Sequence, residues 1–475
     1  MKLPVVAIIG RPNVGKSTLF NCFAKQQKAI VSDIPGTTRD SLMEKVEGDT
    51  FDYFLVDTAG LHNAKGDSLD QEIQMQVEVT LKNADAILFL VDGKASITLE
   101  DEEIILKLRK ATKPLIFVAN KIDDGQTHGI FEFSRFGFGV PLAISAKNFT
   151  GMWELEDAIE NALRACGASE RSKIEEADQE QKASTDMKVV FIGRPNVGKS
   201  SLFNALLGEN RSVVSDIPGT TRDSIDSDFI DTEGQKFIFL DTAGLKRPGK
   251  IGRDIDFWSS VRTHRSIAEA DIGVLLLDAL DGVMHQDLAL AGQILEEKKG
   301  IVIVVNKFDL VREKTKGLSS DDRELEDVKM DKDANQARKN YLSYLLRKMP
   351  FLPSAPVIFL SAKTKRGLSE LLPSIKSVFV ETRRRIPTSE LNKFIEEVYH
   401  GHVTPMRGTM KGSIKYVSQV DIAPPKFLFF VKNKKAFHFS YYRYLENKIR
   451  ERYGFFGVPF VVEFRDGKEG DEFRK

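Results

Sequence analysis

A chain of 475 residues is long enough for about three domains. Its 69 basic residues balance its 69 acidic residues, so overall charge favours neither nucleic acid nor membrane as a partner. Cys22 and Cys166 are too few for a disulfide framework, which favours a reducing compartment. The sequence opens on a strand pattern and its apolar runs are only strand-length, so we expect no signal peptide, no membrane span and a cytoplasmic protein.

The first predicted strand leads into a phosphate-binding pattern. The apolar run 5–9 is followed by GRPNVGKS and then by a helical pattern, and the run 189–192 precedes an identical copy. Glycines let backbone N–H groups surround phosphates, the lysine reaches the β- and γ-phosphates, and the serine hydroxyl binds Mg²⁺. The predicted loops are Gly10, Arg11, Pro12, Asn13, Val14, Gly15, Lys16 and Ser17, and Gly193, Arg194, Pro195, Asn196, Val197, Gly198, Lys199 and Ser200.

Four further motifs recur in the same order. They are IPGTTRD at 34–40 and 217–223, DTAGL at 57–61 and 241–245, NKID at 120–123 with NKFD at 306–309, and SAK at 145–147 and 361–363. From the phosphate loop onward, the offsets between copies are 183, 183, 184, 186 and 216. One domain therefore occurs twice in tandem, and 30 extra residues (216 − 186) precede the second SAK.

Within each copy, short apolar runs such as 54–56, 86–91 and 115–119 alternate with helical patterns. This order predicts an α/β fold, a doubly wound and mostly parallel sheet with ligands at the carboxyl ends of its strands. We assign the copies to residues 1–166 and 188–382, joined by a flexible, polar linker at 167–187. The insertion, at about 311–340, has 8 basic and 8 acidic residues and is expected to be a solvated loop or an exposed helix.

From residue 383 the pattern changes to that of a small α+β domain ending at 467. A helix at 390–399, strands at 413–419 and 426–431, a helix at 441–453 and a strand at 460–464 are predicted. The polar tail 468–475 is expected to be frayed.

The second and third motifs have the composition of a nucleotide switch. The DTAG aspartates end strands and are expected to hold Mg²⁺, and the glycine N–H groups to meet the γ-phosphate. The two IPGTTRD threonines would complete the Mg²⁺ shell only while that phosphate is present, giving an order–disorder switch. These residues are Thr38, Asp57, Thr58, Ala59, Gly60 and Leu61, and Thr221, Asp241, Thr242, Ala243, Gly244 and Leu245. Lys16, Lys199 and the two threonines are the predicted catalytic residues.

Asn-Lys-x-Asp and Ser-Ala-Lys specify the base. An aspartate carboxylate can accept hydrogen bonds from both donors on the guanine edge, whereas adenine lacks that donor pair. The lysine stem can cover the base, the asparagine can brace the loops, and the alanine N–H can donate to guanine O6. The residues are Asn120, Lys121, Ile122, Asp123, Ser145, Ala146 and Lys147, and Asn306, Lys307, Phe308, Asp309, Ser361, Ala362 and Lys363.

With these motifs the chain resembles the TRAFAC-class GTPases. Two tandem G domains, a small basic domain and the sequence YGFFGVP at 453–459 resemble the Der (EngA) family over residues 5–465. The resemblance implies GTP hydrolysis, a KH-like third domain and a role in assembling the large ribosomal subunit. The insertion departs from the usual family pattern.

Two further features concern turnover. Leu61 and Leu245 stand where many small GTPases carry a water-orienting glutamine, so intrinsic hydrolysis should be slow or depend on another group. Asn13 and Asn196 occupy positions that hold K⁺ in related GTPases, so the resemblance also implies potassium activation. The alternative for these asparagines is that they only brace the loop or the switch.

The third domain suggests the partner. Residues 383–462 hold 15 basic against 6 acidic side chains, and aromatic residues are interleaved among them, a combination that suits RNA. Most of those aromatics are expected to be core, and the GFFG sequence at 454–457 to be a structural turn. They are Tyr416, Phe427, Phe429, Phe430, Phe437, Tyr441, Tyr442 and Tyr444.

The predicted function is a two-site GTP switch, monomeric, with Mg²⁺ and with the large ribosomal subunit and its rRNA as partners. No DNA or integral membrane partner is expected. One alternative is a nucleotide-gated RNA- or ribosome-binding protein with negligible turnover, and another is a GTPase acting in tRNA modification or at membranes.

Overall fold

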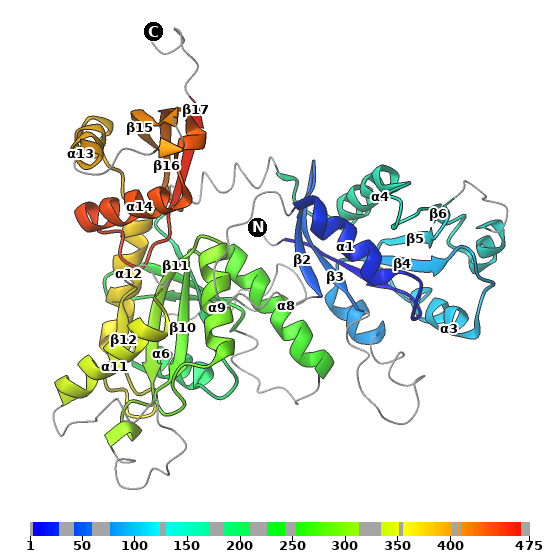
Figure 1. The fold of residues 1–475 in the computed structure, drawn as a ribbon. Coiled ribbons are helices and arrows are strands. Elements are labelled where there is room, and N and C mark those ends of the chain that lie inside the picture. The colour runs from blue at the N-terminus through cyan, green and yellow to red at the C-terminus, as the bar shows by residue number, and fades with distance from the viewer. Residues whose placement is uncertain are drawn as a thin grey trace, which may run out of the picture. The chain divides into compact units, whose positions relative to one another are not determined.

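The computed structural model describes residues 3–27, 42–58, 77–123, 130–171, 184–209, 226–242, 253–312, 334–350, 355–400, 406–407 and 410–466 (Figure 1). The chain forms two compact units. One consists of Met1–Gln181, Thr221–Asp223 and Pro248–Glu269, and the other of Lys182–Thr220, Ser224–Arg247 and Ala270–Lys475. None of the helices in the described ranges is long and apolar enough to cross a membrane.

The first unit is built on a sheet with the strand order β2-β3-β1-β4-β5-β6. Only the edge strand β2 runs antiparallel to its neighbour, which confirms the predicted doubly wound, mostly parallel sheet. The strands are β1 (Val5–Ile9), β2 (Met43–Glu47), β3 (Asp52–Asp57), β4 (Ala86–Asp92), β5 (Leu115–Asn120) and β6 (Leu142–Ala143).

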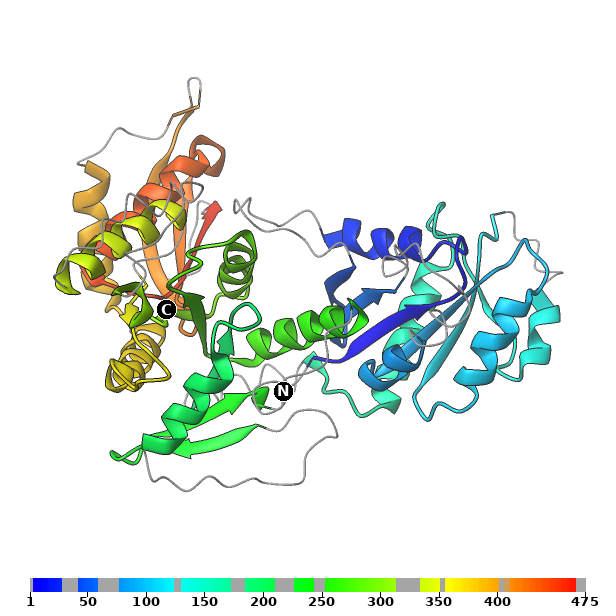
Figure 2. The ribbon, with the colours of Figure 1, turned by 90° about the horizontal axis from the view of Figure 1, so that it is seen from below.

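Helices cover both faces of this sheet (Figure 2). Helices α1 (Lys16–Gln27) and α4 (Met152–Ala165) pack on one face, and α3 (Leu99–Leu108) and the 3-10 helix η2 (Ile130–Phe136) pack on the other. Because both faces are covered, the central strands are continuous apolar runs. Helix α8 (Arg253–Glu269) groups with this unit although its sequence lies within the second repeat.

The second unit repeats the topology, with the order β12-β11-β10-β7-β9-β8 and β8 antiparallel. Its strands are β7 (Met187–Ile192), β8 (Ser227–Ile230), β9 (Lys236–Leu240), β10 (Ile272–Asp278), β11 (Gly300–Asn306) and β12 (Val357–Phe359). Its helical segments are α6 (Lys199–Glu209), α9 (His285–Glu296), η3 (Leu310–Arg312), α11 (Ala334–Lys348), η5 (Leu368–Glu370) and α12 (Leu371–Thr382).

The predicted insertion is only partly described. Its residues from Ala334 onward form the start of α11, whose Tyr341 is fully buried, so this helix packs on the domain. Residues 313–333 of the insertion, 172–183 of the linker and 467–475 at the end lie outside the described residues.

The C-terminal domain has the predicted α-β-β-α-β order, with a short hairpin added. Its elements are α13 (Thr388–His400), β13 (Met406–Arg407), β14 (Met410–Lys411), β15 (Ser413–Asp421), β16 (Lys426–Lys432), η6 (Lys434–Ala436), α14 (Phe439–Tyr453) and β17 (Val461–Asp466). The three long strands form a sheet in the order β15-β16-β17, which α13 and α14 cover on one face (Figure 1).

This domain and the second α/β domain share one hydrophobic core. The turn at 454–457 joins them: the Gly457 carbonyl accepts a hydrogen bond from Ile301 N at 2.7 Å, and the Glu381 carboxylate accepts one from Phe455 N at 2.8 Å. Phe455 itself is completely buried. These contacts confirm that the GFFG sequence is a structural turn, and they hold the two domains together within the unit.

Replacing Gly457 with alanine is expected to loosen this junction. Gly457 has φ +69°, and a Cβ there would lie 2.6 Å from the Ile301 carbonyl oxygen. Strain and overlap together should lower the free energy of unfolding by about 2 kcal/mol and the melting temperature by about 6 °C. Gly234→Ala is the matched control, because Gly234 has φ +82° but nothing within 4 Å. Equal melting temperatures in a thermal scan of the two variants would contradict this prediction.

Candidate functional site

The phosphate loops connect β1 to α1 and β7 to α6, and the lysine is held inside each loop. Lys16 Nζ donates hydrogen bonds to the carbonyls of Gly10 at 2.6 Å and Arg11 at 2.8 Å. In the second loop Lys199 Nζ donates to the corresponding carbonyls at the same distances. Both ammonium groups are thereby fixed where a glycine-rich loop receives phosphate oxygens.

Burial lowers the pKa of Lys16 and of Lys199 to about 8, although the nearby DTAG aspartate carboxylates act in the opposite direction and raise it. Bound phosphate would favour the charged form and raise these pKa values again. Nucleotide binding should therefore take up protons as pH rises above about 8, and affinity should fall by up to about tenfold per pH unit.

Calorimetry of GDP binding between about pH 7 and pH 8.5, in two buffers of different ionisation enthalpy, would measure this uptake. Lys16→Arg should abolish the contribution of the first site, because arginine stays charged throughout this range. An affinity that does not change with pH would contradict the prediction.

An asparagine side chain braces the phosphate loop against the base-recognition loops. In the first copy Asn120 Nδ2 donates to the Val14 carbonyl at 2.9 Å, and its Oδ1 accepts from Ala146 N at 3.0 Å. A Cβ on Gly15, where φ is +98°, would lie 2.3 Å from Asn120 Nδ2, so only glycine fits. The alanine N–H that we expected to donate to guanine O6 is thus engaged by the asparagine.

The second copy has the same brace. Asn306 Nδ2 donates to the Val197 carbonyl at 2.8 Å, and Ala362 N donates to Asn306 Oδ1 at 3.0 Å. Gly198 has φ +97°, with the same 2.3 Å approach to the asparagine amide.

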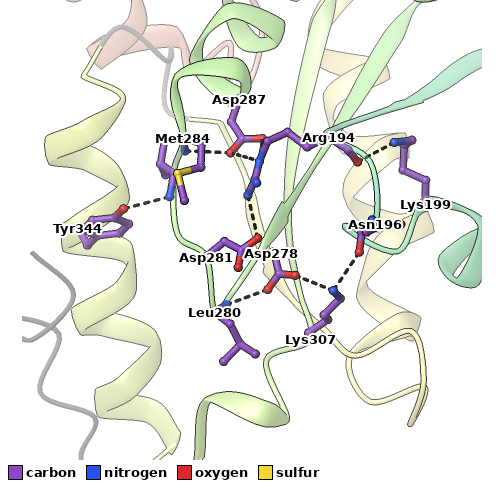
Figure 3. Close-up of polar contacts among 11 residues, drawn as sticks. Arg194, Asn196, Lys199, Asp278, Leu280, Asp281, Met284, Asp287, Lys307 and Tyr344 are labelled. Carbon is purple, nitrogen blue, oxygen red and sulfur yellow. Dashed lines mark hydrogen bonds and ion pairs between the residues drawn. The ribbon is translucent and has the colours of Figure 1, made fainter. Parts of the chain in front are cut away.

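The lysine of each Asn-Lys-x-Asp motif bridges the base loop to the phosphate loop. Lys121 Nζ donates to the Asn13 carbonyl at 2.6 Å and to Asp92 Oδ2 at 2.6 Å. Lys307 Nζ makes the same pair of contacts, at 2.9 Å to the Asn196 carbonyl and 2.6 Å to Asp278 Oδ2 (Figure 3). The lysine stems therefore lie where they can cover a bound base.

Two predicted Mg²⁺ ligands of the first copy are already together. Ser17 Oγ donates a 2.6 Å hydrogen bond to Asp57 Oδ2, and the Asp57 side chain is buried. A hydroxyl and a carboxylate are the oxygen ligands that Mg²⁺ prefers, so these residues fit the ion. In the second copy Ser200 and Asp241 follow the paired strands β7 and β9. The threonine after each aspartate is buried: Thr58 Oγ1 donates to the Ile8 carbonyl, and Thr242 contacts Ser227.

The two base-reading aspartates differ. Asp123 accepts hydrogen bonds from Ser145 Oγ at 2.7 Å and Asn148 Nδ2 at 3.2 Å, and it pairs with Lys94; the Lys94 and Ser145 bonds lower its pKa. In contrast, Asp309 Oδ1 is buried and accepts no hydrogen bond from the described residues. The two copies therefore differ in how many protein donors already engage the aspartate.

Sequence reasoning missed a carboxylate that anchors each phosphate loop. The Asp287 side chain is fully buried, and each of its two oxygens accepts a 3.1 Å hydrogen bond from Arg194 Nε (Figure 3). Its Oδ2 also accepts a hydrogen bond from Met284 N at 3.0 Å. Burial raises the pKa of Asp287, opposed by its contacts with Met284 N and Arg194. Arg194 also approaches Asp281, at 3.4 Å.

The first copy pairs its arginine with the corresponding aspartate, as an ion pair without a hydrogen bond from Nε. Arg11 Nε lies 3.3 Å from Asp101 Oδ2, and Asp101 forms a capping box with Thr98 at the start of α3. A signal for this carboxylate was present, because Asp101 and Asp287 are 186 residues apart, which is also the offset of the Asn-Lys-x-Asp motif. Each phosphate loop is therefore tied to the first turn of the helix that follows the central strand β4 or β10.

Helix α11 contacts the second site from outside. Tyr344 Oη accepts a hydrogen bond from Val283 N at 3.0 Å, in the loop that leads to Asp287 (Figure 3). The Tyr341 ring packs against Phe308 of the base loop and against Phe359, with centroids 6.1 Å and 5.8 Å apart. The residue that follows the insertion thus supports the base-recognition loop.

Several predicted switch residues lie outside the described residues. They are Thr38, Ala59, Gly60, Leu61, Thr221, Ala243, Gly244 and Leu245.

Comparison with known proteins agrees with this architecture. The family described as "50S ribosome-binding GTPase" matches residues 5–121 and 188–307, and the "KH-domain-like of EngA bacterial GTPase enzymes, C-terminal" family matches residues 385–465. GTPase Der of Clostridium botulinum is 39% identical over 99% of this chain and 100% of its own length. GTPase Der of Thermomicrobium roseum is 40% identical over 98% and 96%.

The chain belongs to the Der family of GTPases. It is accordingly a GTP-hydrolysing protein with two P-loop G domains and a KH-like C-terminal domain. A solved structure of Aquifex aeolicus Era bound to GDP·AlF4⁻ covers 59% of this chain and 93% of its own, with 19% identity and a TM-score of 0.29.

Proposed function

We propose that the protein is a two-site GTP switch that acts in assembly of the large ribosomal subunit and binds it through rRNA. The observation that carries this proposal is the single core shared by the second G domain and the basic KH-like domain. Because the two are packed together, a change at the second nucleotide site can alter how the basic surface is presented. The description of the matching family as ribosome-binding supports the same partner. The protein would act as a cytoplasmic monomer.

The site residues have the following roles in this proposal. Lys16 and Lys199 hold the β- and γ-phosphates and stabilise charge in the transition state. Asn120 and Asn306 fix the loops, and the neighbouring Asn-Lys-x-Asp aspartates select guanine. Ser17, Thr38 and Asp57, and Ser200, Thr221 and Asp241, would hold Mg²⁺, which neutralises charge on the β- and γ-phosphate oxygens.

Potassium activation is part of the proposal. Asn13 and Asn196 have φ +66° and +65°, and each carbonyl accepts from the lysine of the base loop. Their side chains are the proposed K⁺ ligands. Single-turnover hydrolysis should be faster in KCl than in NaCl at equal ionic strength, and Asn13→Ala should remove that difference at the first site. Equal rates in both salts would contradict this assignment.

Co-sedimentation tests the ribosomal role. The full chain is mixed with purified large subunits in GDP, in a non-hydrolysable GTP analogue, or without nucleotide. We expect association with the large subunit that depends on the nucleotide, and none with the small subunit. Association that is the same in all three nucleotide conditions would favour a constitutive RNA binder. Absence of association would refute the proposed partner.

A further inference from the structure

The KH-like domain has a sheet face that its core does not use. One face of β15, β16 and β17 is buried against α13 and α14 through residues such as Val417, Phe429 and Phe464. On the other face Tyr416 pairs directly with Phe430, and Phe430 pairs with Arg465. Directly paired residues point to the same side of a sheet. Tyr416, Phe430 and Arg465 therefore form one row across the three strands, which we call the aromatic row.

The aromatic row is accessible. Tyr416 is 44% exposed, Phe430 is half-buried and Arg465 is exposed. The two ring centroids are 6.0 Å apart, with the planes tilted by 40°. The other aromatics of the strands, Phe427, Phe429 and Phe464, are buried in the core. The sequence prediction that most aromatics here are structural holds for Phe427 and Phe429, and Tyr416 is an exception.

Positive charge surrounds the row at one end. Lys415 lies in the bulge beside Tyr416, and Lys432 is two residues along β16 from Phe430. Lys434 and Lys435 follow in η6, and all four side chains are exposed. At the other end Glu463 is matched by two cations, Lys426 at 2.8 Å and Arg465 at 2.9 Å. The charge on this face complements a polyanion.

The neighbouring edge of the sheet is partly closed. Asn392 of α13 donates to the Val417 carbonyl at 2.8 Å and accepts from Val417 N at 2.9 Å. Those backbone groups of β15 are thus taken, which disfavours a peptide adding as a further strand there. The face of the sheet, with its rings and cations, is therefore a better candidate for a partner than this edge.

We propose that the aromatic row binds single-stranded RNA, with bases stacked on Tyr416 and Phe430 and phosphates held by Arg465 and the adjacent lysines. This inference rests on the proposed ribosomal function and names the surface and the form of RNA. Every base has a π face that stacks on an aromatic ring, but in a duplex those faces are hidden. An exposed ring on an open sheet therefore selects unpaired nucleotides.

The test compares variants of the full chain. Tyr416→Leu removes the ring but keeps apolar bulk, Tyr416→Phe keeps the ring, and Val420→Ala is a control at a residue 45% exposed on the same strand. The probes are a labelled single-stranded RNA of about 10 nucleotides, the same sequence in a duplex, and purified large subunits. GDP binding at the second site, whose domain shares the core, reports that each variant is folded.

We expect Tyr416→Leu to weaken single-strand binding about tenfold, with Tyr416→Phe and Val420→Ala within about twofold of the unsubstituted chain. The duplex should bind weakly and without dependence on the ring. Unchanged single-strand affinity in Tyr416→Leu would overturn the proposal. The proposal would also be overturned if Tyr416→Leu lost binding to the large subunit but kept its affinity for single-stranded RNA, because the aromatic row would then contact a protein. If the unsubstituted chain did not bind large subunits, but its binding of single-stranded RNA still depended on the Tyr416 ring, the ribosomal role would be refuted and the proposed RNA surface would be supported.

Discussion

Replacing Lys16 with alanine is expected to lower single-turnover GTP hydrolysis at the first site by roughly a thousandfold. Its ammonium is buried and held by two loop carbonyls, so it is oriented before the nucleotide arrives. Lys199→Ala should do the same at the second site, where the geometry is repeated. Each single variant should therefore keep the turnover of one site, and the double variant should lose both.

Lys113→Ala is the matched control for the first site. Lys113 also donates to backbone carbonyls, of Lys82 and Ala84, but at the opposite end of the sheet from the phosphate loop. Its loss should leave hydrolysis unchanged. If both phosphate-loop single variants hydrolysed GTP at the original rates, the proposed lysine roles would be wrong.

Replacing Asp309 with asparagine is expected to shift the second site from guanine toward xanthine. The carboxylate is expected to accept from the guanine N1–H and N2–H groups, and its Oδ1 accepts no hydrogen bond from the described residues. An asparagine amide instead presents a donor, which meets the guanine amino group unfavourably but matches the carbonyl that xanthine carries there. GTP affinity at this site should fall at least about a hundredfold, and xanthosine triphosphate should become the better ligand.

Competition binding with the two nucleotides measures this exchange, with Asp228→Asn as the control. Asp228 is a carboxylate of β8 that pairs with Lys236 at 3.0 Å. The corresponding substitution in the first copy, Asp123→Asn, should give a smaller change in nucleotide preference, because Ser145 and Asn148 already donate hydrogen bonds to that carboxylate. A second site that still preferred GTP over xanthosine triphosphate after Asp309→Asn would remove Asp309 from the base-recognition role.

The twofold repeat made much of the fold predictable from the sequence. Unbroken apolar runs such as 86–91 and 301–305, alternating with helical patterns, indicate strands covered on both sides, and motifs directly after such strands are expected to gather at one edge of the sheet. The same logic assigned Ser17 and Asp57, which are 40 residues apart, to one Mg²⁺ site, and the structure joins them by a hydrogen bond. Repetition at a near-constant offset then carried each assignment to the second copy.

Side-chain anchoring was less visible. Nothing in a single copy marks Asp287 as the partner of Arg194, since an aspartate at a helix start is ordinarily a cap. The packing of Tyr341 on Phe308 was also missed, because the charged insertion was assumed to extend through the start of α11. Both contacts join segments that are distant in sequence, and they form only when α9 and α11 pack against the sheet in a particular position.

By itself the sequence determined the nucleotide chemistry, because short motifs after strands carry their own geometry in the backbone. It also determined the order of the domains, since periodicity and composition change where the fold changes. Only the tertiary structure decided which aromatics of the KH-like domain are core and which face outward. In a bulged strand such as β15, the register decides to which side of the sheet each side chain points. That register is fixed by packing against β16 and α13 rather than by the strand's own residues.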